Sequence, residues 1–552
     1  MVAVKRKKLR RIIFILSGVL LFFIAVVFFL ANFYVEPVLR KRLDTLVVEG
    51  SDSLYSYTLA DLHINFLGGN IGVHDLQVRL DSTKYNQLKS RGKLPALTMQ
   101  IDVNRAHIKG LGIFALLFNK KIVIDEISSE DADIRINRYL RQKDTVQEEK
   151  ETVPLWKAIR PRLKDVVVHK IRLDGIRLLY KNEEGDEGKL QFDRCDALFE
   201  NIRVDSTAVL DTSRIGYVKN FSFKLNDLKF RTTDSTYKLK AEWITYNSEK
   251  RLLEVDSFKI QPTLRVADRD DSLRKSWYTV TLDKVSFMGL RLDRYLRLNR
   301  AEADSVIFQK PVLAVYQDMS ALKTYQSKIG KYPHQLLVNA RAVIDIKKFI
   351  AHDMAVAVTE KHEVTGEEGT INLSDINLSV SNIVNDPVRI RQNGVSRAEA
   401  EGKIIGSPIR ASFLFYLDSA GGRFDVKGRI GATTAAQINP ISSRMANIEV
   451  PSVNISSIDF FVRGQDYEAT ADVQMVYNNL SIIFRKRDME KGTNTTRKFL
   501  TNLLNRYAIN PSNNGERVAT KVRAPRLTTQ SFFGIIWRAV FEGMQQIMLK
   551  MG

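Results

Sequence analysis

The feature that most constrains this 552-residue chain is an alternation of apolar and polar side chains that dominates from about residue 43 onward. The alternation over residues 59–66 breaks at Leu67-Gly68-Gly69-Asn70 and resumes over residues 71–80. Because successive side chains of a strand point to opposite faces, this pattern predicts strand, glycine turn and strand. Similar alternating runs cover residues 221–225, 278–282 and 424–430. The chain is therefore expected to be mainly β.

One segment is apolar enough to cross a bilayer. It runs from Ile12 to Val35 without a charged residue, and about 20 such residues in a helix span a hydrocarbon layer of roughly 30 Å. A cleaved signal peptide is the alternative, but this segment is longer than the usual apolar region of such peptides and no small-residue cleavage site follows it. We expect a retained N-terminal transmembrane helix over residues 12–35, with membrane contacts at Ile12, Phe22, Phe29 and Tyr34.

Charges flanking this segment set its expected orientation. The tail of residues 1–11 is rich in lysine and arginine, whereas fewer basic residues, at 40–42, follow the helix. The positive-inside rule then places the tail in the cytoplasm and the chain from residue 36 onward on the other side. The triplet Asn220-Phe221-Ser222 lies within a strand pattern, where a glycan would obstruct a sheet. The expected location is therefore the inner membrane of a bacterial envelope, with a periplasmic body.

The overall charge predicts an anionic partner. Lysine and arginine number 84 against 63 acidic residues, a net charge of +21. This excess suits an anionic membrane surface or phospholipid headgroups, and the exported location argues against the alternative partner, nucleic acid. The single cysteine, Cys195, can form neither an intramolecular disulfide nor a cysteine-based zinc site.

The sequence offers no convincing catalytic or metal-binding constellation. Its seven histidines are scattered, and it contains no HExxH, phosphate-binding loop or G-x-S-x-G motif. An envelope hydrolase remains a minor alternative, because a site assembled only in three dimensions leaves no linear signature. We expect a protein that is not an enzyme, with no catalytic residue, no metal and no cofactor.

An internal repeat is visible between residues 133–141 and residues 289–297. Both segments contain Arg-Leu/Ile-x-Arg-Tyr-Leu-Arg in the same register, and each is followed by further strand patterns. A chance likeness between arginine- and leucine-rich segments is the alternative. If the repeat is real, it predicts a sheet that grows by adding similar strand units.

The C-terminal third divides into a β-meander and a helical end. Glycine-containing strands over residues 401–490 follow the main β-rich body of residues 36–400, and residues 491–552 form the last segment. Residues 531–552 are expected to form an amphipathic helix with Phe533, Ile536 and Val540 on its apolar face. Trp537 and Phe541 flank this face and are expected membrane contacts. Packing of this helix on its own domain is the alternative.

The order of these parts resembles the AsmA-like family of Gram-negative envelopes. A basic tail, one helix, an immediate strand–turn–strand at residues 57–80 and a long run of alternating strands carry the resemblance, together with the meander that closes on Tyr477-Asn478-Asn479-Leu480. The likeness covers most of the chain but lies in layout rather than in invariant residues. It implies an elongated, twisted β-sheet trough with an apolar inner face that shields acyl chains.

The expected function follows from such a trough. An apolar face left open favours lipid as its occupant, so we expect a lipid-binding or lipid-transfer protein that supports outer-membrane lipid homeostasis, with phospholipid and outer-membrane or other envelope proteins as partners. A scaffold for outer-membrane assembly that carries no lipid is the second interpretation, and a closed β-sandwich core is the structural alternative. The expected lipid contacts share strand faces at Phe221, Phe223, Leu225, Phe413, Phe415 and Leu417.

Overall fold

The computed structural model describes most of the chain from residue 47 to residue 550. The described residues are 47–65, 69–112, 115, 119–139, 156–157, 164–182, 190–232, 235–263, 276–318, 327–361, 366–445, 448–487, 494–496 and 509–550. Of these residues, 63% lie in strands and 15% in helices, which confirms the prediction of a mainly β protein. None of their helices has the length and apolarity needed to cross a membrane. The predicted transmembrane segment, residues 12–35, lies outside the described residues.

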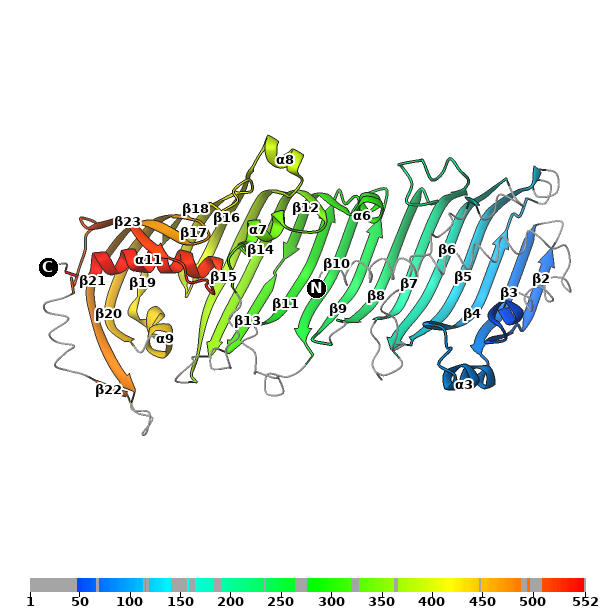
Figure 1. Cartoon of the computed structure of the whole chain (residues 1–552), viewed down its shortest axis with the longest axis horizontal. Coiled ribbons are helices and arrows are strands. Elements are labelled where there is room, and N and C mark those ends of the chain that lie inside the picture. The colour runs from blue at the N-terminus through cyan, green and yellow to red at the C-terminus, as the bar shows by residue number, and fades with distance from the viewer. Residues whose placement is uncertain are drawn as a thin grey trace. The chain divides into compact units, whose positions relative to one another are not determined.

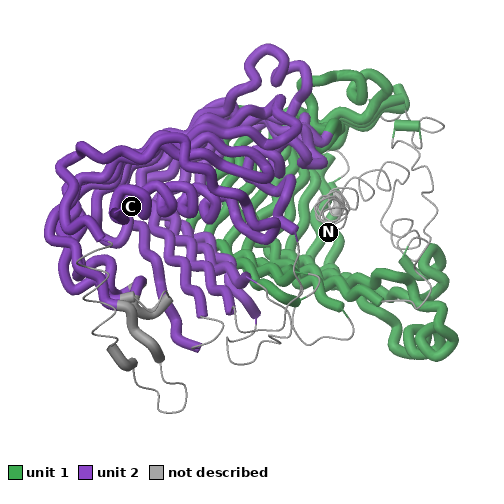
Figure 2. The backbone as a smooth tube through the Cα atoms, turned by 60° about the vertical axis from the view of Figure 1, so that its left-hand side comes forward, with its two compact units in different colours: residues 1–256, 296–298 green, residues 257–295, 299–552 purple. Residues whose placement is uncertain are grey.

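The chain forms two compact units (Figure 2). Residues 1–256 with 296–298 form the first, and residues 257–295 with 299–552 form the second. The first unit contains the short helix η2 (Glu49–Ser51), helix α3 (Ser82–Ser90) and an extended, twisted sheet (Figure 1). Its strands are β1 (Tyr55–Thr58), β2 (Asp61–Asn65), β3 (Asn70–Leu80), β4 (Leu97–Lys109), β5 (Lys121–Arg138), β6 (Asp165–Asn182), β7 (Leu190–Val204), β8 (Asn220–Arg231) and β9 (Tyr237–Asn247). β10 (Leu252–Pro262) runs across the boundary.

The second unit is also built on a long twisted sheet (Figure 1). Its strands are β11 (Ser276–Met288), β12 (Arg300–Gln309), β13 (Val312–Asp318), β14 (Val343–Lys361), β15 (Glu368–Val384), β16 (Val395–Ile404), β17 (Ser407–Tyr416), β18 (Phe424–Ile430), β19 (Thr433–Thr434), β20 (Ile448–Gly464), β21 (Glu468–Arg487), β22 (Asn494–Thr496) and β23 (Val518–Pro525). Its helices are most of α6 (Leu292–Leu298), α7 (Pro333–Val338), α8 (Pro387–Gln392), α9 (Ala435–Met445) and α11 (Phe532–Met548).

Strand order follows chain order in both units, and neighbouring strands are mostly antiparallel. The predicted strand–turn–strand near the start is confirmed as β2 and β3, which pair from Asp61 and His74 to Asn65 and Asn70. Parallel pairing occurs in both units. β5 lies parallel to β6 in the first, and β14 lies parallel to β12 and β13 in the second.

The two units contain the same strand arrangement, which indicates an internal duplication. β4 and β11 are both 13 residues long, and each pairs with the next strand in an equivalent register. In the first unit the pairs run from Leu97 with Arg138 to Lys109 with Glu126, and in the second from Ser276 with Gln317 to Met288 with Ser305. β5 corresponds to β12 and β13 together, β6 to β14, and β7 to β15.

Equivalent turns support this duplication. Gly110 and Gly289, which follow β4 and β11, both have φ of +68°, a conformation that glycine adopts without strain. A Cβ on Gly110 would meet the carboxylate of Asp125, and one on Gly289 would meet that of Asp304. The equivalent turn therefore lies against an aspartate side chain in both units.

The register of the sequence repeat was wrong, although a duplication exists. Asp133–Arg138 belongs to β5, whereas residues 292–298 form helix α6, so the segments matched in sequence have different conformations. Leu292, Tyr295 and Leu296 also have the three- and four-residue spacing of a helix. The spacing of arginine and leucine in this segment fits both the strand period and the helix period. The turn at Gly289 ends β11 before this segment begins.

The predicted C-terminal helix is confirmed as α11, with Ser531 as its N-cap. The Ser531 hydroxyl accepts a hydrogen bond from the Gly534 N–H at 3.1 Å, which satisfies one of the free donors of the first turn. Ile536 and Val540 are buried as expected, but Phe533 is 67% exposed and Phe532 takes the buried position. The buried face of α11 is therefore rotated relative to the predicted face. Phe532 and Phe533 both fit a wide apolar arc, so the sequence pattern did not distinguish between them.

Candidate functional site

One face of the first unit's sheet carries apolar residues that are cross-strand neighbours from strand to strand. A first apolar row passes from β3 to β8 through Ile71, Ile108, Ile127, Ile171, Phe199 and Phe221. Every member is the direct partner of the next. The row therefore runs across the strands, along the direction in which the sheet extends.

A second apolar row runs beside the first. It passes from β2 to β9 through Leu62, Val73, Ala106, Ser129, Leu173, Ala197, Phe223 and Tyr246, with Ser129 as its one polar member. Leu225 lies on the same face beyond Phe223 and pairs with Cys195 and Ile244. The predicted triplet Phe221, Phe223 and Leu225 thus shares one apolar face.

The opposite face of this sheet is charged. Ion pairs link neighbouring strands there, including Arg79 with Asp102 (2.5 Å), Arg105 with Glu130 (3.3 Å), Arg172 with Glu126 (3.5 Å) and Lys229 with Asp193 (3.8 Å). Such surface pairs contribute little to stability individually. A shift of one residue in strand register would bring these charges onto the apolar face. The ion pairs therefore help to fix which face of the sheet meets water.

Exposure of the apolar face changes along the sheet. Ile127 and Ile171 in the middle strands are buried, whereas Phe199, Phe221 and Phe223 nearer the β8 end are only partly buried. Phe221 lies between Phe199, with ring centroids 6.1 Å apart, and Tyr246, at 5.0 Å. The rings of Phe199, Phe221 and Phe223 therefore retain some accessible apolar surface, whereas Tyr246 is buried.

Cys195 lies on this face as a buried apolar residue rather than as a reactive thiol. Burial raises the pKa of the Cys195 thiol to about 12, and the neighbouring Asp196 carboxylate acts in the same direction. The thiolate is the reactive form of cysteine, so this side chain is inert at neutral pH.

The second unit has a comparable third apolar row. It passes from β11 to β23 through Phe287, Val306, Phe349, Val380, Ala398, Phe413, Val426, Val462, Ala471 and Val522. Helix α11 packs on β20, β21 and β23, at the end of this row. A Cβ on Gly543 would lie 2.5 Å from Val473 Cγ2, so glycine permits the helix to approach β21 closely.

The second predicted triplet lies at the margin of this helix-covered core. Phe413 and Phe415 have parallel rings 6.0 Å apart, and both contact Phe532 of α11, at 6.3 and 5.6 Å. Leu417, just beyond β17, is buried. The two predicted triplets therefore have different surroundings: Phe221 and Phe223 lie on a sheet face, whereas Phe413 and Phe415 pack against a helix. Lipid contact by either triplet stays a prediction.

A buried polar cluster near α11 was missed from the sequence. The Arg526 guanidinium donates hydrogen bonds to the Asp466 carbonyl (3.1 Å), the Lys328 carbonyl (2.7 Å) and the Gln530 carbonyl (2.9 Å). It also lies 4.1 Å from the centroid of the Tyr332 ring. Arg526 thus joins three segments that are distant in sequence. Nothing in the linear pattern distinguishes it from the many exposed arginines.

His334 is a buried histidine that lies beside this cluster. It is 4% exposed and its ring lies 5.1 Å from that of Phe415. Burial lowers the pKa of His334 from 6.5 to about 4, although the nearby Asp466 carboxylate opposes the shift. The unfolded chain therefore binds the proton more readily than the folded chain between these two values.

Stability is accordingly expected to fall as the pH drops from 7 to 5, by about 2 kcal/mol from this residue. Urea unfolding of the full chain at both pH values measures the change. A His334→Gln variant, which cannot be protonated, is the control and should lose this part of the pH dependence. The same pH dependence in both proteins would contradict the assignment to His334.

The outer face of α11 carries an exposed aromatic stripe. Trp537 is 52% and Phe541 is 39% exposed, and their rings stack with centroids 6.3 Å apart. Phe533, one turn earlier, completes the stripe. The predicted membrane contacts Trp537 and Phe541 thus lie on an open helix face, and membrane contact itself stays a prediction. Ile12, Phe22, Phe29 and Tyr34 lie outside the described residues.

Comparison of the chain with models of protein families and with curated proteins gives no significant match. The resemblance to the AsmA-like family therefore remains an expectation. Among the described residues, no group of histidine, cysteine, aspartate and glutamate is arranged to hold a metal ion.

Proposed function

We propose that this protein binds phospholipid acyl chains on the apolar rows of its sheets and transfers lipid within a bacterial envelope. The observation that carries the proposal is the aromatic group around Phe221. The partly exposed rings of Phe199, Phe221 and Phe223 lie there on two neighbouring strands, beside the buried Tyr246. Exposed apolar surface that is contiguous across several strands favours an apolar occupant.

The direction of the rows suits a chain-like occupant. Neighbouring strands lie roughly 4.8 Å apart, so cross-strand partners form a continuous apolar track rather than isolated spots. The charged opposite face stays in water, and a headgroup at the edge of the sheet would remain hydrated. Binding on such a track needs little specific polar recognition. It suits a ligand that is bound mainly through its hydrocarbon chains.

The membrane anchor and the location belong to the same proposal. A helix over residues 12–35 would hold the body at the inner membrane with the tail in the cytoplasm, and the layout resembles AsmA-like proteins. Such tethering would place the apolar rows next to a source of lipid.

A scaffold that organises outer-membrane assembly without carrying lipid is the competing function. Mass spectrometry of lipids that copurify with the full chain in a mild detergent separates the two. If the protein carries acyl chains, phospholipid should remain in a fixed proportion to protein after extensive washing. Lipid lost in parallel with bulk detergent-solubilised membrane would favour the scaffold.

A further inference from the structure

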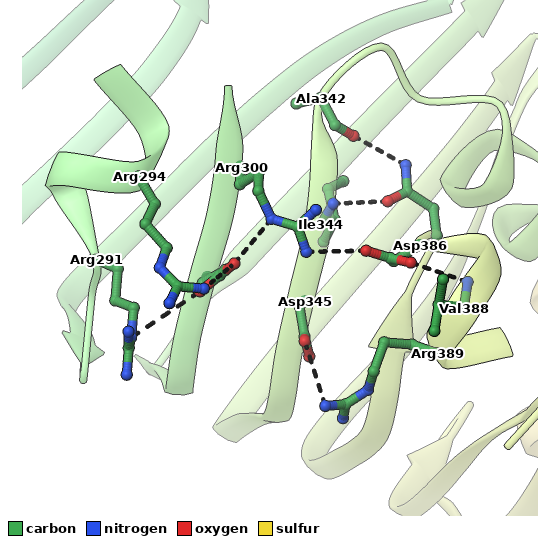
Figure 3. Close-up of polar contacts among 11 residues, drawn as sticks. Arg291, Arg294, Arg300, Ala342, Ile344, Asp345, Asp386, Val388 and Arg389 are labelled. Carbon is green, nitrogen blue, oxygen red and sulfur yellow. Dashed lines mark hydrogen bonds and ion pairs between the residues drawn. The ribbon is translucent and has the colours of Figure 1, made fainter. Parts of the chain in front are cut away.

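An arginine cluster lies at one edge of the second unit, around the starts of β12 and β14 (Figure 3). Arg294 Nη1 donates to both oxygens of the Glu302 carboxylate, at 3.0 and 2.8 Å, and Arg300 Nε donates to the same carboxylate at 2.9 Å. Arg300 Nη2 also donates to Asp386 at 2.8 Å. Burial opposes ionisation of Glu302, but the hydrogen bonds from Arg300 and Arg294 hold its pKa below the ordinary value.

Two further arginines flank this cluster without close pairing. Arg291 Nε lies 3.9 Å from Glu302, and Arg389 Nη1 lies 3.7 Å from Asp345. Both distances exceed hydrogen-bonding range, and the two side chains are 40% and 47% exposed. A guanidinium has five N–H donors in a planar fork that suits phosphate, so Arg291 and Arg389 retain donors for an external anion.

Helix α8 presents Arg389 from a well-fixed position. The Asp386 carboxylate accepts a hydrogen bond from the Val388 N–H at 2.9 Å. The Asn385 side chain accepts one from the Ile344 N–H at 2.6 Å and donates one to the Ala342 carbonyl at 2.8 Å. These bonds attach the base of α8 to the start of β14 (Figure 3).

The exposed surface of α8 combines arginine with aliphatic side chains. Val388 is 54% exposed, and Pro387, Arg389 and Arg391 are also exposed. In Figure 1, α8 stands out beyond the edge of the sheet. Arginines around an exposed aliphatic residue suit the headgroup layer of an anionic bilayer, where phosphates meet the charges and the aliphatic group leaves water.

We propose that this edge of the second unit, formed by α8 with Arg291, docks on an anionic phospholipid surface. The headgroup phosphates are contacted by Arg389, Arg391 and Arg291. The ion pairs of Glu302 and Asp386 keep the neighbouring arginines in place. Six of the chain's net charge of +21 lie in the basic tail of residues 1–11, and the remaining +15 adds long-range attraction to the same surface. This docking is separate from acyl-chain binding, because the arginines lie outside the three apolar rows.

Capture of vesicles in trans tests this docking. The full chain is held in phosphatidylcholine nanodiscs and mixed with vesicles of phosphatidylcholine alone or with phosphatidylglycerol. Capture is expected only with phosphatidylglycerol and should weaken as salt is added. Arg389→Gln combined with Arg391→Gln should weaken capture roughly 25-fold, since each basic residue near an anionic surface contributes about 1 kcal/mol.

A second double variant provides a charge-matched control. Arg410 lies 3.7 Å from Glu401, and Arg429 lies 3.7 Å from Asp459, so Arg410→Gln with Arg429→Gln removes the same charge from similarly loose pairs. Capture by this control is expected to stay within about twofold of the parent. Equal losses in both double variants would show that only net charge matters. Unchanged capture by the α8 variant, or equal capture of neutral vesicles, would overturn the proposal and direct attention to an acidic protein partner.

Discussion

Replacement of Phe532 by alanine is expected to lower the unfolding free energy of the second unit by about 3–5 kcal/mol. The side chain is 6% exposed, and its ring lies 4.8 Å from Phe424, 5.4 Å from Tyr332 and 5.6 Å from Phe415. Truncation leaves a cavity where α11 meets the sheet, and the surrounding rings relax only partly. Urea unfolding of the full chain in detergent, followed by fluorescence, measures the change.

Phe533→Ala is the matched control for this prediction. It removes the same side chain from the adjacent position of the same helix, where the ring is 67% exposed, and is expected to cost less than about 1 kcal/mol. If the two variants have the same unfolding midpoint, α11 does not pack on the sheet through Phe532.

Phe223→Asp is expected to lower phospholipid occupancy roughly tenfold or more, since a carboxylate without a partner is costly among acyl chains. Phe223 is only partly buried and lies in the second apolar row between Ala197 and Tyr246. Water can reach a charge at this position, so the protein should remain folded. Lipid content per protein, with a melting curve of the same sample, measures both outcomes.

Ser222→Asp adds the same carboxylate one residue earlier, where the side chain points to the opposite face. This control should keep its lipid. Unfolding of the Phe223→Asp variant would indicate a closed core at that position, and loss of lipid by both variants would indicate a general effect of charge rather than an apolar track.

The sequence predicted local structure well because alternation is a local property. The strand–turn–strand of β2 and β3 and the C-terminal helix follow from side-chain period and turn residues alone. The apolar rows could not be predicted in the same way. That Ile108, Ile127 and Ile171 are direct neighbours depends on the register of three strands, and one of these pairings is parallel across a long connection.

The candidate site shows the same limit. The two-residue period of a strand placed Phe221 with Phe223 and Phe413 with Phe415. It could not show that Phe532, more than a hundred residues further along the chain, packs on the second pair. The Arg526 cluster was equally invisible, because burial of a charged residue depends on partners that only the fold assembles. The internal duplication was found in the wrong register, since arginine and leucine spacing in residues 289–297 fits a strand and a helix alike.

Site-specific photocrosslinking in living bacteria tests the central claim most directly. A photoreactive residue is placed at Phe223, on the apolar rows, or at Lys224, whose side chain points to the opposite face and lies 4.2 Å from the centroid of the Trp243 ring. If acyl chains occupy the rows, ultraviolet light should attach phospholipid to the chain from position 223 and not from position 224. Equal crosslinking at the two positions, or crosslinking of position 223 only to protein, would contradict acyl binding on this face.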